Sequence, residues 1–169
     1  MFENHQKSNF EYFGRENLNI CCFTRNFAFL AGRLNFFVKK SEKCQTPLHY
    51  ACENGNSSII QHIIPLNINF NPTDVNQMTP LHWACKEGKV EAVQLLFSNV
   101  SIDVNVSNNE GKTPLHLACQ NGNCEIVKLL LKEEGINVDA TDQNGMTAFQ
   151  IASQLSHLEI VQLLLSAKE

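Results

Sequence analysis

The chain of 169 residues lacks the features that mark several common classes of protein. Arginine is absent after Arg33, and no apolar stretch approaches the roughly 20 residues that a membrane-spanning helix needs. The first residues, with Glu3 and Lys7 and no long apolar core, are not typical of a secretory signal. We therefore expect a protein without a membrane partner that resides in the cytoplasm, with the nucleus as the alternative.

Charge is unevenly distributed along the chain. Residues 1–43 carry seven Lys/Arg against four Asp/Glu, a net charge of +3, whereas residues 44–169 carry six against thirteen, a net charge of −7. An acidic segment without arginine is a poor partner for the phosphate backbone of nucleic acid. The composition favours a protein partner with a basic or neutral surface, and no nucleic-acid partner.

The dominant feature that is present is a repeat. Thr-Pro-Leu-His begins at Thr46, Thr79 and Thr113, and a weakened copy, Thr-Ala-Phe-Gln, begins at Thr147. The successive threonines are 33, 34 and 34 residues apart. A period of this size indicates one supersecondary unit stacked on copies of itself. Four such units and an N-terminal piece fill the chain, so no room remains for a separate catalytic domain.

Each copy predicts the start of a helix. The threonine hydroxyl can cap free backbone N–H groups, and proline suits the first helical position, where no N–H is needed. The histidine takes the place of Glu or Gln in a capping box, with its ring able to reach back to the cap backbone, and Gln150 restores the standard box. A residue suited to the left-handed conformation ends each helix: Gly55, Gly88, Gly122 and, less well suited, Ser156.

A second helix follows in each unit. Apolar pairs at helical spacing predict it, as at Ile126, Val127, Leu130 and Leu131. Stretches rich in Asn, Asp and Gly, such as residues 103–111, then lead to the next threonine and are typical of hairpin-like turns. The repeating unit is therefore helix, turn, helix and hairpin.

This pattern resembles the ankyrin repeat, whose signature is a period of 33 residues with Thr-Pro-Leu-His-x-Ala. The resemblance covers roughly residues 40–169, and its best copy runs over residues 108–118. It implies an all-α ankyrin-repeat solenoid of four units, 41–73, 74–107, 108–141 and 142–169, after an N-terminal segment, 1–40. Cys44 and Gln77 stand where later units have Gly111 and Gly145, so we expect the first two turns to be less tightly formed.

The N-terminal segment is harder to interpret. It holds eight of the eleven phenylalanines, so it is too aromatic for a disordered tail. One period before the second helices of the repeats, Phe27, Leu30 and Ala31 fall on core positions. We expect a half-repeat, with one helix near Thr24 to Leu34 that covers the open end of the stack.

The recurring His-x-x-Cys suggests two other kinds of site. Zinc uses both side chains, but a tetrahedral site needs converging ligands, whereas stacking places these pairs in a line. A Cys–His nucleophile pair needs an accessible thiolate, an orienting group and an oxyanion site, which the sequence does not supply. We expect no metal, no other cofactor and no enzyme activity. Instead Cys52, Cys85 and Cys119 are interpreted as buried apolar side chains of a reduced protein, too far apart for disulfides.

In repeat arrays the binding surface is concave and is lined by hairpin tips and the exposed side of the first helices. The resemblance to ankyrin proteins implies contacts beside the turn and just before the residue that ends the first helix. Tyr50 and Trp83 share one position of the first helix, where core packing is favoured and a partly open aromatic anchor is the alternative. The candidate protein-binding residues are Tyr50, Glu53, Asn54, Asn76, Met78, Trp83, Lys86, Glu87, Asn109, Lys112, Gln120 and Asn121.

These expectations describe a monomeric, non-catalytic adaptor or scaffold that presents a rigid surface to a protein partner. An assembly chaperone or stoichiometric inhibitor that masks one partner is the alternative. A piece of a longer ankyrin-repeat protein is a third, because Leu155, Leu158 and Leu163 make the last unit less polar than a terminal cap. The resemblance also implies hydroxylation of Asn105, for which a plain turn asparagine is the competing and favoured interpretation.

Overall fold

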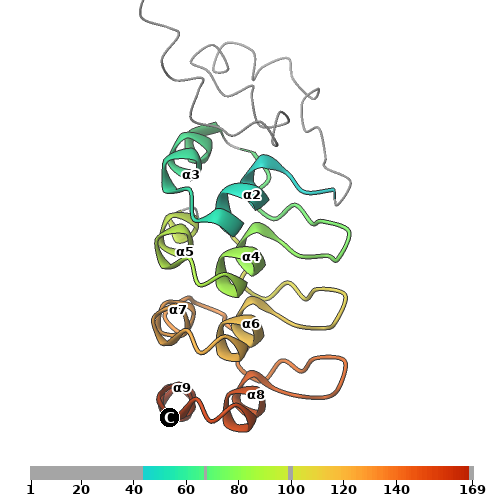
Figure 1. Ribbon diagram of the computed structural model, residues 1–169, viewed down its shortest axis with the longest axis vertical. Helices are drawn as coiled ribbons and strands as arrows, with labels where there is room; N and C mark the ends of the chain where they lie inside the picture. Colours follow the sequence, from blue (N-terminus) through green and yellow to red (C-terminus); the bar gives the residue numbers. More distant parts are fainter. Residues whose placement is uncertain (1–43, 67, 99–100, 168–169) are drawn as a thin grey trace, which may run out of the picture. The chain divides into compact units, whose positions relative to one another are not determined.

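The structure, a computed structural model, describes residues 44–66, 68–98 and 101–167. All of them belong to one compact unit, Lys40–Glu169. Within this unit four helical pairs are stacked one on another (Figure 1). The half-repeat expected near Thr24 to Leu34 lies outside the described residues.

Each pair consists of a first helix, which follows the repeated threonine, and a second helix that returns beside it (Figure 1). The first helices are α2 (Pro47–Asn54), α4 (Pro80–Lys86), α6 (Pro114–Gln120) and α8 (Ala148–Gln154). The second helices are α3 (Ser57–Ile63), α5 (Val90–Phe97), α7 (Cys124–Leu130) and α9 (Leu158–Ser166), and a short 3-10 helix, Ile64–Leu66, follows α3. The expected all-α solenoid is confirmed.

The helices pack in two rows. First helices contact the first helices of neighbouring repeats, and second helices contact second helices. Between the rows lie the apolar pairs that the sequence predicted, of which Ile126, Val127 and Leu130 in α7 are fully buried. Because each repeat packs mainly against its direct neighbours, the stack is held together by a series of similar interfaces.

The repeated cysteines are part of this core. Cys52, Cys85 and Cys119 are fully buried, and all the cysteines of the described residues are free. Burial raises the pKa of the Cys119 thiol to about 12 and raises the pKa values of Cys52 and Cys85 far above their usual range. These thiols are therefore protonated side chains of the core, as their recurrence in the sequence predicted.

The hairpin turns need a residue in the left-handed conformation. Gly111 supplies it in the third repeat with φ of 73°, whereas Cys44 and Gln77 adopt φ of 54° and 55° in the first two. The turn at Gln77 is nevertheless closed like that at Gly111: the Gln77 N–H donates to the Asp74 carbonyl at 3.1 Å, and the Gly111 N–H to the Asn108 carbonyl at 2.9 Å. The expectation of looser turns was wrong for the second repeat, because the hydrogen bonds of the turn outweigh the strain of a side chain at positive φ. The first turn lies partly outside the described residues.

This strain gives a prediction for stability. Gln77→Gly should raise the free energy of unfolding by about 0.5–1 kcal/mol, because it removes the left-handed penalty while adding some entropy to the unfolded chain. Urea denaturation of the full chain measures the change. A variant less stable than the wild type would show that the Gln77 side chain stabilises the turn.

Two glycine variants serve as controls. An added Cβ at Gly111 would lie 2.8 Å from the backbone nitrogen of Gln143, whereas one at Gly145 would meet nothing within 4 Å. Both residues have positive φ, so both alanine variants should lose stability. Gly111→Ala should lose more, since its neighbour is backbone and cannot easily shift.

Candidate functional site

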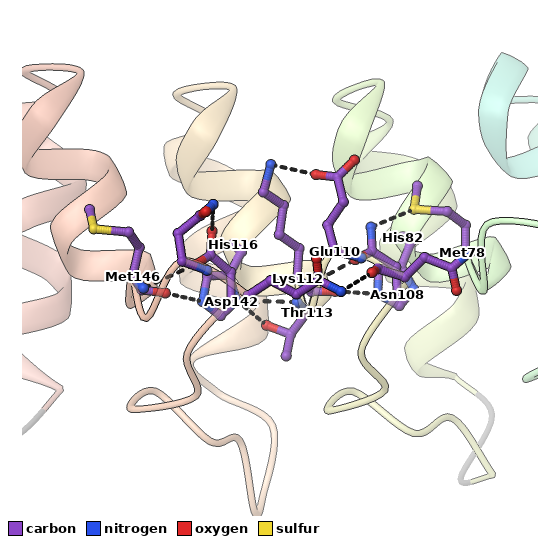
Figure 2. A network of polar contacts seen from close by, with 12 residues as sticks. Met78, His82, Asn108, Glu110, Lys112, Thr113, His116, Asp142 and Met146 are labelled. Carbon is purple, nitrogen blue, oxygen red and sulfur yellow. Dashed lines mark hydrogen bonds and ion pairs between the residues drawn. The ribbon is translucent and has the colours of Figure 1, made fainter.

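Histidines at the starts of the first helices use both of their ring nitrogens. In the second repeat the Thr79 N–H donates to Nδ1 of His82 at 3.0 Å, and the Thr79 hydroxyl lies 2.8 Å from the same nitrogen. Because Nδ1 accepts the backbone proton, the ring proton is on Nε2, which donates to the Lys112 carbonyl of the third repeat at 3.1 Å (Figure 2). The predicted capping box is confirmed, whereas the bond to the next repeat was not foreseen.

The same arrangement recurs along the stack. Nε2 of His49 lies 3.0 Å from the Met78 carbonyl, and Nε2 of His116 lies 3.1 Å from the Met146 carbonyl. In the fourth repeat the Gln150 side chain accepts the cap N–H at 2.8 Å, so an amide replaces the ring. Each histidine therefore joins a helix start to the base of the next hairpin and sets the spacing between repeats.

The rings of His82 and His116 are held in the neutral form. Burial lowers the pKa of His82 to about 4, and burial also lowers the pKa of His116. A doubly protonated ring is a donor at both nitrogens, so it could no longer accept the cap N–H at Nδ1. Protonation would thus remove the hydrogen bond that caps the helix and would also place a positive charge in a buried site.

A buried Asp or Asn organises the hairpin turns of the second, third and fourth repeats, five residues before the threonine. Oδ1 of Asp74 accepts two backbone N–H groups of the turn at 2.8 and 2.9 Å, and Oδ2 accepts the indole N–H of Trp83 at 3.1 Å. Oδ1 of Asn108 and of Asp142 accepts the equivalent N–H pairs in the next two repeats (Figure 2). These residues were not among the predicted site residues, although their recurrence every 34 residues was a signal that could have revealed them.

Neighbouring hairpins are joined through their backbones. The Asn109 N–H donates to the Asn76 carbonyl at 3.0 Å, and the Gln143 N–H donates to the Glu110 carbonyl at 2.9 Å. The Asn109 side chain also donates to the Val75 carbonyl at 3.1 Å. The hairpin tips therefore form a connected edge. The side-chain amide of Asn109 already makes one hydrogen bond within this edge.

Asn105 has a similar joining role farther along its loop. Its side-chain nitrogen donates to the Gly135 carbonyl at 2.8 Å, and its oxygen accepts the Asn137 N–H at 2.9 Å. Asn71, one period earlier, makes the same two kinds of bond to the following repeat. Both bonds of Asn105 support its interpretation as a turn asparagine.

A cleft of about 260 Å³ lies at the junction of the second and third repeats. Its floor consists of Met78, Trp83 and Leu117, each less than a tenth exposed. Seven of the twelve candidate binding residues line this cleft, and the complete polar lining is Asn76, Lys86, Asn108, Glu110, Lys112, Gln120 and Asn121.

Two lysines of the cleft are in different electrostatic states. The ammonium of Lys86 lies 4.6 Å from the centroid of the Trp83 ring, and the side chain of Asn121 donates to the Lys86 carbonyl. The ammonium of Lys112 lies 2.8 Å from the Glu110 carboxylate (Figure 2). The positive charge of Lys112 is therefore locally compensated, whereas Lys86 is held above an aromatic face, which orders it without neutralising it.

The exposure of Met78 corrects one expectation, and the exposure of Trp83 decides between two others. Met78 was expected at the surface but is only 5% exposed, because its side chain turns under the next hairpin, where the Asn108 amide donates to its sulfur at 3.3 Å. Trp83 is 7% exposed, so the favoured interpretation of core packing is confirmed for Trp83, whereas Tyr50 at the same position is half-buried. The remaining candidates do not line the cleft: Tyr50 and Glu53, which are half-buried, and Asn54, Glu87 and Asn109, which are exposed.

Comparison with known proteins agrees with this architecture. A family model described as ankyrin repeats (3 copies) matches residues 18–108 and 100–169. The chain belongs to the ankyrin-repeat family. The first ankyrin match includes the stretch near Thr24 to Leu34, where we expect a half-repeat. A search of curated proteins gave no match.

Two further properties of the described ankyrin repeats bear on the kind of site. None of the helices in residues 44–66, 68–98 and 101–167 is long and apolar enough to cross a membrane. The same residues contain no group of three or more His, Cys, Asp or Glu side chains placed to hold a metal ion.

The neutral histidines predict that the ankyrin stack loses stability in acid. The folded pKa of His82, about 4, lies below the ordinary value of 6.5. Between these values the unfolded chain binds a proton that the folded chain does not, so the free energy of unfolding falls as pH falls. The slope approaches about 1.4 kcal/mol per pH unit for each such histidine. Urea denaturation across this window measures it.

His82→Gln is the matched variant for this effect, because Gln150 shows that an amide closes the same box. The variant should remain folded at neutral pH and lose less stability in acid than the wild type. An unchanged pH dependence would mean that groups other than His82 carry the effect.

Proposed function

We propose that the protein is a non-catalytic adaptor or scaffold that binds a protein partner through the face formed by its first helices and hairpin tips. Ankyrin repeats are in general protein–protein interaction modules. The observation that carries the proposal is the cleft between the second and third repeats, where seven candidate binding residues from two hairpins and two first helices converge. We also propose that the protein is a monomer of the cytoplasm or nucleus.

The use of the His and Cys side chains supports binding over catalysis. His82 has both ring nitrogens occupied by backbone groups, so it has no free position from which to take a substrate proton. Cys85 is fully buried, and its raised pKa keeps it as a thiol, whereas nucleophilic attack needs a thiolate. The histidines His49, His82 and His116 serve as caps, and the cysteines Cys52, Cys85 and Cys119 belong to the core.

The face formed by the first helices and hairpin tips is ordered before a partner binds, because the packing of the repeats fixes its residues in place. Lys86 and Gln120 are exposed at the ends of two adjacent first helices, and Glu87 is exposed directly after the first of them. His82 of α4 is joined to the Lys112 carbonyl in the hairpin of the next repeat. A surface that is ordered before binding loses little conformational entropy on association. Such a face suits an adaptor and equally the alternative, a chaperone or inhibitor that masks one partner.

The last repeat supports the remaining alternative, a longer array. Leu158 and Leu165 are 72% and 52% exposed. One period earlier, Cys124 and Leu131 are half-buried. Apolar side chains at these positions are suited to contact with a following repeat, so the natural protein would be longer in this alternative.

The proposal predicts separate effects on binding and stability. A partner recovered by cross-linking and pull-down with the wild-type chain should bind the triple variant Lys86→Met, Glu87→Ala, Gln120→Ala at least about tenfold more weakly. The variant should unfold within about 1.5 kcal/mol of the wild type, because exposed substitutions change stability by about half a kcal/mol each. Titration calorimetry and urea denaturation measure the two quantities.

The chain offers a matched control on the opposite side of the repeats. Lys128→Met, Glu91→Ala, Gln94→Ala replaces the same residue types at exposed positions of α5 and α7. This variant should bind the partner like the wild type. If the control variant lost binding and the first variant kept it, the contact surface would lie on the second helices instead.

A further inference from the structure

We propose that the cleft between the second and third repeats receives a single acidic side chain from a short, otherwise uncharged partner segment, with Lys86 as the cation that binds the carboxylate. This inference rests on the proposed function and specifies the chemistry of the partner. It is carried by four properties of the cleft: its size, its uncompensated charge, its free amides and its surroundings.

The size of the cleft suits a side chain of a protein partner better than a whole small-molecule ligand. Its volume, about 260 Å³, lies below the range of about 300–1,000 Å³ typical of ligand pockets. The floor of Met78, Trp83 and Leu117 is apolar, and the rim is polar. Small apolar-floored depressions within a larger surface are where anchor side chains of a partner bind.

The charge of the cleft favours a carboxylate. Lys112 is paired with Glu110 at 2.8 Å, and Lys128 on the outer side is paired with Glu159 at 2.8 Å. Lys86 forms no ion pair with any described residue and is already ordered over the Trp83 ring. A carboxylate would therefore complete the interactions of Lys86 without displacing an existing acidic partner, and little side-chain entropy would be lost.

Free amides beside Lys86 favour a peptide segment. The side chains of Asn76 and Gln120 line the cleft, are exposed, and make no hydrogen bond to a described residue. An amide offers both a donor and an acceptor, which matches the N–H and C=O of a peptide backbone. Lys86 would then bind the acidic side chain while Asn76 and Gln120 bind the adjacent main chain.

The surroundings of the cleft limit the partner to one such charge. Residues 44–169 carry a net charge of −7 and no arginine, so a segment with several acidic residues, or a phosphate polymer, is repelled by the rest of the array. In a segment with one acidic residue beside apolar residues, the carboxylate can bind Lys86 while an apolar side chain contacts the floor of the cleft. The overall preference for neutral or basic partners is thus compatible with a local preference for an acid.

A library of random dodecapeptides displayed on phage and panned on the full chain provides the probe. Enriched peptides should share one Asp or Glu next to a large apolar residue. Synthesised with a fluorescent label, such a peptide should bind about tenfold or more tightly than its own Glu→Gln or Asp→Asn version, as measured by fluorescence anisotropy. The difference should shrink with added salt.

Variants of the chain connect this preference to Lys86. Lys86→Met should bind the acidic peptide about tenfold more weakly and bind the amide version like the wild type, whereas the control Lys128→Met should bind both peptides like the wild type. Lys86→Glu should prefer a peptide in which Lys replaces the acid. This reversal separates direct recognition from structural damage, and thermal unfolding of each variant checks the fold.

Several outcomes would overturn the inference. The first two are enrichment of peptides that contain no acidic residue, and acidic peptides that bind Lys86→Met and the wild type equally well. The other two are panning that enriches no peptides over a Lys86→Glu chain, and a single-stranded oligonucleotide that binds more tightly than the acidic peptide. The proposed function fails on a different result, the full binding of a pulled-down partner by the triple variant of the first helices. The two failures are therefore distinguishable.

Discussion

The neutral histidine ring that joins one repeat to the next is the interaction on which the rest of the stack depends. A helix start leaves backbone N–H groups without partners, and Nδ1 of His82 accepts one of them at Thr79. Nε2 then donates to the carbonyl of Lys112, the residue directly before the next cap threonine. Because the ring is rigid and buried, and buried polar atoms need partners, it fixes the distance from one helix start to the following one. The face formed by the first helices and hairpin tips, which we propose binds a partner, takes its regular spacing from this constraint.

What the sequence could predict was local or periodic. The capping boxes, the left-handed Gly55 and the buried faces of the second helices depend on residues within one repeat or on the 33–34-residue period, and each was found where expected. The bond from Nε2 of His82 depends on which atom the following repeat brings to the ring. Such contacts between repeats are invisible in the pattern of a single unit, because several arrangements of neighbours share the same apolar periodicity.

The two corrected expectations have different origins. Met78 was placed on the surface because it flanks a turn, but Asn108 of the following repeat covers it. Gln77 was expected to loosen its turn because it replaces a glycine, but the buried Asp74 carboxylate holds that turn with two backbone N–H groups. At Met78 a contact with the following repeat overrides the local preference, whereas at Gln77 hydrogen bonds within the turn itself do so. The cleft, like the burial of Met78, is a product of two repeats that neither would form alone.

The second repeat differs from the others at the positions that build the cleft. Asp74 fixes the indole of Trp83, and that ring supports the ammonium of Lys86, so a turn residue orders a surface cation through one aromatic side chain. In the third repeat the equivalent positions hold Asn108, Leu117 and Gln120, which provide neither an indole nor a cation. The histidine and apolar positions that hold the stack together recur, while the positions facing the cleft vary. In the proposed function, the few side chains that vary at the cleft would therefore set the specificity, while the recurring positions hold the stack together.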